Sequence, residues 1–350
     1  MRILAIDTSC DETAAAVIDG TKILSNVVWS QASAHAKFGG VMPSLAQRMH
    51  EERIDFVIQK ALKNGKWKME NLDAIAVAVG PGLSIALGVG IDRAKKLAIK
   101  YNKKIIGVNH LEGHLLSPFA NDKWQMPNDK FPMLGLVVSG GNTILVKINK
   151  IGSYDTLAQT SDDALGEALD KAARMLGLGY PGGAILEKMA KFGDPTKYKL
   201  PIPLLGQEER KIFSYSGLKT SMMRKIAEVK SKNGELSKQD VYDLATSFQD
   251  VAFIHLIRVS SFAVENCKLL VPRGVKIDNL LVGGGVSANV ELRKRLRKLC
   301  KEFNINVHFP YSKKLTGDNA AMIGIAASFK YDRGEFTEVD KIDRSPNLKI

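Results

Sequence analysis

Short runs of Val, Ile, Leu and Ala recur along the chain, each followed by small polar residues or glycine. Runs of this kind are typical of buried strands, whereas longer segments with apolar residues every three or four positions predict amphipathic helices. We expect strands at 3–6, 14–18, 74–79, 105–108, 133–138, 144–148 and 279–284. We expect helices near 43–63, 84–100, 110–116, 162–179, 239–267 and 291–303. Strands and helices that alternate in this way predict an α/β fold.

Two pairs of strand-like runs share one layout. The run ILAI (3–6) ends in DTSCDET and is followed by AAAVI (14–18), and MLGLVV (133–138) ends in SGGNT and is followed by ILVKI (144–148). Each pair predicts two strands joined by a turn of hydroxyl, acidic and glycine residues. We interpret the repeated layout as an internal duplication, with one copy at the start of each of two lobes.

The expected lobes follow from these repeats and from a polar stretch between them. The segment NDKWQMPNDK (121–130) is rich in turn-forming and charged residues and is interpreted as the connector. The first lobe is expected at 1–130, completed by a C-terminal helix near 318–330. The second lobe is expected at 131–317. A length of 350 residues suits two lobes of this size.

Composition points to a cytoplasmic globular protein. Hydrophobic residues make up 45% of the chain and charged residues 25%, which is ordinary for a globular protein. Three cysteines, Cys10, Cys267 and Cys300, offer no disulfide framework and no zinc-binding spacing. The opening apolar run is too short for a signal peptide, and no run approaches the ~20 residues of a membrane span. We therefore expect a reducing cytosol.

The chain is strongly basic, and its charge is unevenly distributed. The net charge is +13, and basic residues gather at 93–104, at 210–232 and at 291–303. In the third cluster, apolar residues follow helical spacing and leave the basic groups on the opposite face: Leu292, Leu296, Leu299 and Phe303. Any one cluster is also consistent with a solvated helix face. Three clusters together with the net excess favour a nucleic-acid partner.

The stretch GVNHLEGHLL (107–116) places two histidines on one face of a helix, because His110 and His114 are four residues apart. A zinc protease with this spacing needs a glutamate directly after the first histidine, and here that residue is Leu111. Glu112 points about 200° around the helix from His110, at roughly 100° per residue. The reversed H-x-x-E-H pattern fails at Gly113. The pair therefore predicts a metal site without a protease's base, in which Glu112 is an exposed or capping charge.

Four turns rich in glycine and hydroxyl residues are candidates for binding an anion: GPGLS, SGGNT, YPGGA and GGGVSAN. None matches a P-loop or a dinucleotide-binding fingerprint. Together they favour a nucleotide held between two lobes. Other polar residues leave two interpretations open. Asp7 orients a metal or phosphate or caps the next turn, Asp170 forms a helix-surface ion pair with Arg174 or contacts a ligand, and Asn289 caps the basic helix or contacts a ligand.

Seven motifs together resemble the tRNA N6-adenosine threonylcarbamoyltransferases, a family once labelled O-sialoglycoprotein endopeptidase. They are IDTSCDETA, HLEGH, VVSGGNT, DDALGEALDKAARMLGLGYPGG, FSYSGLKTSM, GGGVSANVELR and TGDNAAMIG. The resemblance covers about residues 2–330. SCDETA, with Val137 before VSGGN, is similar to the bacterial type. The resemblance implies a two-lobed α/β fold of the actin/Hsp70/sugar-kinase type with internal duplication.

The resemblance also implies roles for individual residues. It implies that His110, His114 and Asp318 bind one divalent metal, with iron(II) suggested by the family and zinc also suited to these ligands. It implies an adenylate-binding set of Val138, Ser139, Gly140, Gly141, Asn142, Asp170, Gly183 and Asn289. The chain departs from the family at Asp7 (usually Glu), at Asn142 (usually His in bacteria), at Glu187 (often Asp) and at Gly317 (usually Cys or Thr). We leave Glu187 out of the expected substrate contacts.

The reaction implied by the resemblance moves a threonylcarbamoyl group from threonylcarbamoyl-AMP to N6 of adenosine 37, in tRNAs that read codons beginning with A. Asp11 and Glu12 are the motif residues proposed to take the N6 proton. Bacterial relatives work with a homologous non-catalytic subunit and a small ATPase, and no membrane is involved. Three alternatives remain: an ATP-dependent kinase of the same fold, a metalloprotease, and an Hsp70-like scaffold. The kinase would need an aspartate base beside a sugar, and the scaffold leaves the metal pair unexplained.

Overall fold

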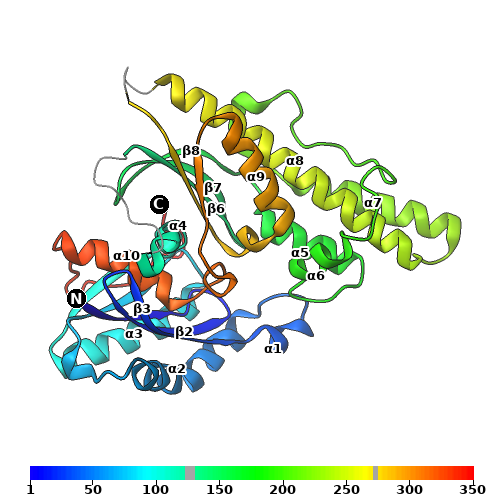
Figure 1. Ribbon diagram of the computed structural model, residues 1–350. Coiled ribbons are helices and arrows are strands. Elements are labelled where there is room, and N and C mark those ends of the chain that lie inside the picture. Colours follow the sequence, from blue (N-terminus) through cyan, green and yellow to red (C-terminus); the bar gives the residue numbers. More distant parts are fainter. Residues whose placement is uncertain (123–130, 271–274) are drawn as a thin grey trace. The chain divides into compact units, whose positions relative to one another are not determined.

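The structure is a computed structural model that describes residues 1–122, 131–270 and 275–350 (Figure 1). The chain forms two compact units, residues 1–128 with 309–350 and residues 129–308. Residues 309–317, which we expected in the second lobe, belong to the first unit. Most of the expected connector, from residue 123 to 130, lies outside the described residues.

The first unit contains a five-stranded sheet in the order β3-β2-β1-β4-β5. Strands β1, β2 and β3 are antiparallel neighbours, and β4 and β5 continue the sheet parallel to β1. The strands are β1 (Arg2–Asp7), β2 (Glu12–Asp19), β3 (Lys22–Ser30), β4 (Ala74–Gly80) and β5 (Lys104–Asn109). The helices are α1 (Ala32–Ala36), α2 (Pro43–Gly65), α3 (Ser84–Tyr101), α4 (His110–Leu116) and α10 (Ala320–Asp332). Figure 1 shows α2 and α3 on one face of this sheet, with α4 and α10 on the other.

The second unit contains a six-stranded sheet in the order β11-β10-β6-β7-β8-β9. Its strands are β6 (Met133–Val138), β7 (Thr143–Lys150), β8 (Ser153–Thr160), β9 (Ile212–Phe213), β10 (Asn279–Gly283) and β11 (Asn306–His308). Its helices are α5 (Leu165–Met175), α6 (Gly183–Met189), α7 (Ser216–Asn233), α8 (Lys238–Leu270) and α9 (Val290–Glu302). Strands β6, β7 and β8 are antiparallel neighbours, while β10 and β11 run parallel to β6.

The two sheets share one topology. Strands β1 to β3 correspond to β6 to β8, and β4 and β5 correspond to β10 and β11, with the same pairing senses. In both units a helix joins the last two strands, α3 in the first and α9 in the second. The repeat confirms the predicted α/β fold with internal duplication, since the two copies of the motif begin at the expected hairpins.

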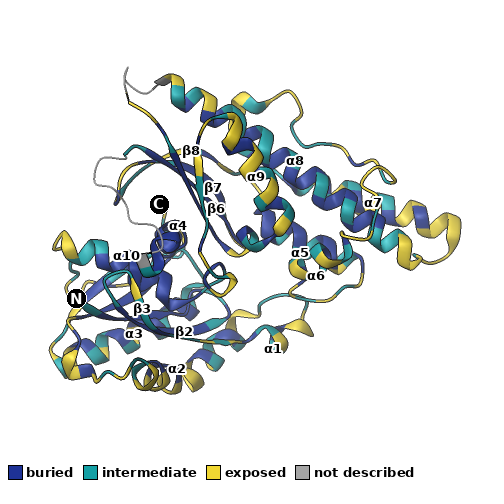
Figure 2. Cartoon of the chain, in the orientation of Figure 1, coloured by how far each residue is buried: buried dark blue, intermediate teal, exposed yellow. Residues whose placement is uncertain are grey.

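Burial explains why the apolar runs form these strands. Strand β6 is buried along its whole length and β1 from Ile3 onward, as their continuous apolar sequences predict. Figure 2 shows the buried residues concentrated in the strands of both sheets and in α4. The helix expected over 162–179 is shorter, because Ala164 is extended and Gly177 has φ 72°. Within the described residues, no helix is long and apolar enough to cross a membrane.

Candidate functional site

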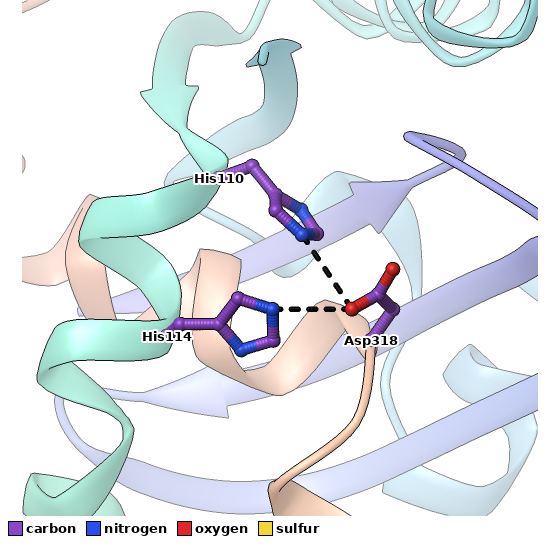
Figure 3. A group of neighbouring side chains, drawn as sticks. All are labelled: His110, His114 and Asp318. Atoms are coloured by element: carbon purple, nitrogen blue, oxygen red, sulfur yellow. Dashed lines mark hydrogen bonds and ion pairs between the residues drawn. The ribbon is translucent and has the colours of Figure 1, made fainter. Parts of the chain in front are cut away.

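Three side chains of the first unit converge at the start of α4 (Figure 3). His114 Nε2 lies 3.1 Å from Asp318 Oδ1, and His110 Nε2 lies 3.5 Å from the same oxygen. One ligand atom from each residue lies within 4.8 Å of the other two. The His110 and His114 side chains are almost fully buried, and that of Asp318 is 22% exposed. The two histidines predicted to share a helix face therefore point at one carboxylate that is distant in the sequence.

Two asparagine caps hold these residues in place. Asn109 ends β5, and its Oδ1 accepts hydrogen bonds from Leu111 N at 2.8 Å and Glu112 N at 3.4 Å, so α4 begins at His110. Asn319 caps α10 in the same way, since its Oδ1 accepts from Met322 N at 3.2 Å. The alternative of Asp318 as the helix cap is therefore wrong, and its carboxylate is left to face the histidines.

Gly113 permits the close approach of α4 to α10. A Cβ at this position would lie 3.1 Å from Ile323 Cδ1 and 3.2 Å from Met322 Cγ. Distances of this size are tighter than ordinary van der Waals contact, so a side chain here would push the two helices apart. The glycine that disqualifies the reversed protease motif thus serves the packing of the two helices that carry the site.

Asp7 and Ser9 hold the second nitrogen of His110. Ser9 Oγ lies 3.0 Å from His110 Nδ1, and Asp7 Oδ2 lies 3.4 Å from it. Asp7 Oδ1 also accepts a hydrogen bond from Ser9 N at 3.0 Å. Both interpretations of Asp7 are therefore met, because one oxygen caps the turn and the other faces the histidine. A carboxylate behind a histidine is the usual arrangement around metal-binding imidazoles.

The chemistry of the donor set fits a divalent cation. Two imidazole nitrogens and one carboxylate oxygen suit iron(II) or zinc and leave positions open for a substrate. Asp7 Oδ2 and His114 Nδ1 are buried atoms without a hydrogen bond in the described ranges. Burial favours a low pKa for His110, but the carboxylates of Asp318 and Asp7 outweigh it and hold that pKa well above its usual range. The pKa of Asp318 is lowered despite its burial, because both histidines stabilise the carboxylate.

The turn between β1 and β2 brings the two proposed catalytic acids beside this group. Asp11 is 8% exposed, and Glu12 accepts a hydrogen bond from Ser30 Oγ at 3.2 Å. Burial, followed by the charges of Asp318 and Asp11, raises the pKa of Glu12 to about 10. Four acidic side chains, those of Asp7, Asp11, Glu12 and Asp318, thus lie in one region of the first unit. This density of negative charge is suited to a bound cation.

Glu112 lies in the first turn of α4 and is 5% exposed, so the expectation of an exposed charge is wrong. The helix is buried at every position, because α10 and the 3₁₀ segment Ser117–Asp122 pack against it. Glu112 is not a member of the ligand group formed by His110, His114 and Asp318. The acid that a metalloprotease places beside its first histidine is Leu111 in this chain.

The second unit contains a pocket of about 240 Å³. Four of the residues expected to contact adenylate line it: Gly140, Asp170, Gly183 and Asn289. The other four, Val138, Ser139, Gly141 and Asn142, belong to the same β6–β7 turn as Gly140. That turn is closed by hydrogen bonds from Ser139 N to Asn142 O at 2.8 Å and from Asn142 N to Ser139 Oγ at 3.1 Å. The pocket is therefore formed by three of the four predicted glycine turns.

Polar side chains fix the walls of this pocket. Asp170 Oδ1 accepts hydrogen bonds from Gly182 N at 2.9 Å and Gly183 N at 2.6 Å. Asn289 caps α9, as one of its two interpretations held, and its Nδ2 donates to Gln249 Oε1 at 2.9 Å. Each of these two pocket residues therefore also holds the backbone or a neighbouring side chain in place.

Glu187 is a pocket residue that the sequence analysis left out. It lines the cavity, and its Oε1 accepts a hydrogen bond from Val290 N at 2.8 Å, at the start of α9. Its position one helical turn after Gly183 is the signal that could have included it, because residues four apart share a helix face. The expected set was therefore incomplete at this wall of the pocket.

The fourth turn, GPGLS (80–84), is wrong as an anion site. Gly82 N donates to Pro346 O at 3.1 Å, and Leu83 N donates to Ser9 O at 2.8 Å. A Cβ on Gly80 would overlap the carbonyl of Ser345. The turn is thus packed against residues 345–349, which also accept a hydrogen bond from Asn109 Nδ2 at Lys349 O (2.8 Å).

The third basic cluster forms α9, with Leu292, Leu296 and Leu299 buried as predicted. Two of its arginines are already engaged. Arg293 is partly buried and donates to Ser287 O at 2.6 Å, and Arg295 pairs with Asp250 and Glu291. Four basic side chains of the helix remain exposed: Lys294, Arg297, Lys298 and Lys301. The basic surface is therefore narrower than the sequence predicts.

Comparisons with known proteins agree with this geometry. Residues 22–325 match the family model described as TsaD, tRNA N6-adenosine threonylcarbamoyltransferase. The chain is 42% identical over 343 residues to the tRNA N6-adenosine threonylcarbamoyltransferase of Pelagibacter ubique, covering 97% of this chain and 92% of that protein. It is 44% identical over 339 residues to the enzyme of the same name from Staphylococcus haemolyticus, covering 97% and 94%.

Solved structures resemble the chain in fold. The activator of the 2-hydroxyisocaproyl-CoA dehydratase from Clostridium difficile superposes with a TM-score of 0.53 at 14% identity, covering 97% of this chain and 99% of that one. HypF of T. kodakarensis gives 0.57 at 14% identity, covering 97% and 49%. These likenesses confirm the actin/Hsp70/sugar-kinase type of fold and carry no activity. The match to the family model and the identity to its curated members do: the chain belongs to the tRNA N6-adenosine threonylcarbamoyltransferase family, enzymes that transfer a threonylcarbamoyl group to N6 of an adenosine in tRNA.

Proposed function

We propose that His110, His114 and Asp318 hold the metal ion used in transferring a threonylcarbamoyl group from threonylcarbamoyl-AMP to N6 of adenosine 37. One observation carries the proposal: both histidine Nε2 atoms lie within 3.5 Å of one oxygen of Asp318, in a buried site without a protease's base. The metal is iron(II) or zinc, because these ions accept two imidazoles and one carboxylate with positions left open.

The donor is a mixed anhydride and is already activated, so the remaining step is acyl transfer to a weakly nucleophilic amine. When bound, the metal supplies a Lewis acid that polarises the carbamoyl carbonyl. The protein's part is to fix the ligands. Asp7 and Ser9 hold His110 Nδ1, so its Nε2 faces Asp318, and the caps at Asn109 and Asn319 fix the backbone that carries the ligands.

We assign the N6 proton to Asp11 or Glu12. The exocyclic amine must lose a proton once the new N–C bond forms, and a carboxylate within hydrogen-bond reach can accept it. Both acids belong to the β1–β2 turn, whose Ser9 contacts His110. The high pKa of Glu12 in the metal-free protein makes Asp11 the better base there, because an acceptor must be ionised.

We assign the adenylate to the pocket of the second unit. The support is its lining by Gly140, Asp170, Gly183, Glu187 and Asn289. Glycines at the wall let backbone N–H groups approach a phosphate, and the neighbouring turn 138–142 offers further donors to a developing oxyanion. Asp170 and Glu187 act by holding the backbone of their neighbours, as their hydrogen bonds to Gly183 N and Val290 N indicate.

We propose that the tRNA phosphates contact the exposed face of α9. The four exposed cations support this assignment, as does the net charge of +13. We also propose that the chain works in a complex with a homologous non-catalytic subunit and a small ATPase. The resemblance of its motifs to the bacterial type supports this assembly, and cytoplasmic tRNA places the reaction in the cytoplasm.

Metal analysis combined with the transfer reaction tests the proposal. The purified chain is incubated with its partner subunits, threonylcarbamoyl-AMP and unmodified tRNA, and the modified nucleoside is quantified after digestion. His110→Ala and His114→Ala should each lose the bound metal and abolish the product. His308→Ala is the matched control, because His308 is a partly buried histidine of the second unit that bonds Asn279. Full metal occupancy in His114→Ala would contradict the assignment.

A further inference from the structure

The turn that carries Asp11 is held by three separate elements. The carbonyl of Ser9 accepts a hydrogen bond from Leu83 N at 2.8 Å, and that of Asp11 accepts one from Gln31 N at 2.9 Å. The carbonyl between them, at Cys10, contacts the imidazole of His50, whose Nε2 lies 3.1 Å away. Only this middle contact comes from a side chain. His50 lies on α2, is 0% exposed and is not a member of the metal group.

The second nitrogen of His50 reaches the other end of the acidic pair. His50 Nδ1 lies 2.8 Å from Thr13 Oγ1, at the residue that follows Glu12. A carbonyl oxygen only accepts, so Nε2 must carry the proton and donate to Cys10 O. Nδ1 is then unprotonated and accepts from the Thr13 hydroxyl. One neutral imidazole therefore spans the residue before Asp11 and the residue after Glu12. Burial lowers the pKa of His50, which agrees with this neutral form.

The acids need such support because they repel their neighbours. Asp11 and Glu12 lie close enough to Asp318 for its charge to raise the pKa of Glu12, and Asp7 lies on the same side of the site. Before a cation is bound, mutual repulsion favours movement of the turn away from the ligands. A buried imidazole tied to a 23-residue helix resists that movement, because α2 packs on both β2 and β3.

We propose that His50 is a positioning residue of the transfer reaction, which fixes Asp11 and Glu12 beside the metal group through its bonds to Cys10 O and Thr13 Oγ1. The proposal rests on the proposed function of these two acids. It assigns His50 no contact with substrate or metal. It also gives Thr13 a purpose that its place inside a strand does not explain, since a β-branched apolar residue would serve the strand equally well.

Three variants separate the two bonds. His50→Ala removes both. His50→Gln keeps a side-chain N–H at about the reach of Nε2 and retains the bond to Cys10 O, whereas Thr13→Val removes only the donor to Nδ1 and lets the imidazole change tautomer. The readouts are kcat and KM in the transfer reaction, the metal content, and the thermal midpoint. Ser25→Ala is the control for a lost buried bond on the same helix, because Ser25 Oγ donates to Ala61 O at 2.7 Å on α2.

A misplaced catalytic group costs up to about 100-fold in rate. We expect His50→Ala to lower kcat by about 10- to 100-fold, with KM for both substrates and the metal content within about twofold of wild type. His50→Gln should recover most of that loss, and Thr13→Val should fall between the two. Ser25→Ala should lower the thermal midpoint and leave kcat unchanged.

The outcomes distinguish this proposal from the proposed function. Wild-type kcat in folded His50→Ala would overturn the positioning role, and so would loss of metal in parallel with activity, because His50 would then support the ligands instead of the acids. If His50→Ala does not fold, Thr13→Val decides, since wild-type kcat in that variant overturns the role. Activity retained by His110→Ala would overturn the proposed function itself.

Discussion

Replacing Asp7 by asparagine should weaken metal binding while leaving the fold intact. Asp7 is 1% exposed, and its two oxygens have different partners: Oδ1 accepts from Ser9 N at 3.0 Å, and Oδ2 lies 3.4 Å from His110 Nδ1. Asparagine has the same shape but only one acceptor oxygen. If that oxygen stays on Ser9, the amide NH₂ faces the imidazole nitrogen that should donate toward it; the opposite orientation places the NH₂ against Ser9 N.

The magnitude follows from what the carboxylate provides. A charged acceptor behind a metal-binding histidine fixes the ring and makes the opposite nitrogen a stronger ligand, and its loss typically reduces metal affinity 10- to 100-fold. At 1.36 kcal/mol per factor of ten, this is about 1.4–2.7 kcal/mol of binding free energy. The same order is expected here, because Asp7 is buried and no water competes for Oδ2.

The assay is competition for iron(II) or zinc against a chelator of known affinity, followed by the thermal midpoint of each metal-free variant. Asp19→Asn is the matched control, because Asp19 ends β2 as an exposed residue and pairs only with the chain's start at Met1 and Arg2 in the described structure. We expect Asp19→Asn to bind metal as wild type does. An affinity within twofold of wild type in Asp7→Asn would refute the orienting role of the carboxylate.

Three further predictions follow from the site and the basic helix. In the metal-free protein, the raised pKa of His110 contributes stability that is lost as pH rises through that pKa, and the lowered pKa of Asp318 contributes stability that is lost as pH falls through it. The destabilisation by Asp318→Asn should therefore be largest between their unfolded values of 3.8 and 6.5 and shrink at alkaline pH; a difference that is constant with pH in chemical denaturation would contradict this. Glu112→Gln should keep transfer within a few-fold of wild type and the protein should cleave no glycoprotein; metal-dependent proteolysis that Glu112→Gln abolishes would restore the protease interpretation. Charge reversal of three exposed α9 lysines should flatten the salt dependence of tRNA binding by about 0.7–0.9 in slope per phosphate contact, and an unchanged slope would return them to solvent: Lys294, Lys298 and Lys301.

The sequence predicted the central strands well because burial on both faces produces continuous apolar runs. It missed β3 and β8, whose polar and apolar residues mix because much of each strand is accessible to solvent. The topology could be inferred only in part. The repeated hairpins indicated a duplication, but the parallel pairings of β4 and β10 depend on contacts far apart in the chain.

The candidate site shows the same division between local and distant information. Helical spacing was enough to place His110 and His114 on one face, since four residues make about one turn. Asp318 is 204 residues from His114, so only the resemblance connected it to the pair. The burial of Glu112 depends on α10, and the closure of the GPGLS turn depends on residues 345–349. Neither partner leaves a trace in the local pattern.

The first unit is assembled from the two ends of the described chain, 1–128 and 309–350, with the whole second unit between them. During synthesis, His114 leaves the ribosome 204 residues ahead of Asp318, which is about 10–40 s at bacterial and eukaryotic elongation rates. Throughout that interval the face of β1 and β2 that α10 will cover is open to solvent, and the histidine pair lacks its carboxylate. The nascent chain therefore passes through a state with an exposed apolar sheet and an incomplete ligand set. Metal acquisition becomes a late event in the life of the protein, coupled to the docking of α10, and a chain that stalls within the second unit is a substrate for chaperones before it is an enzyme.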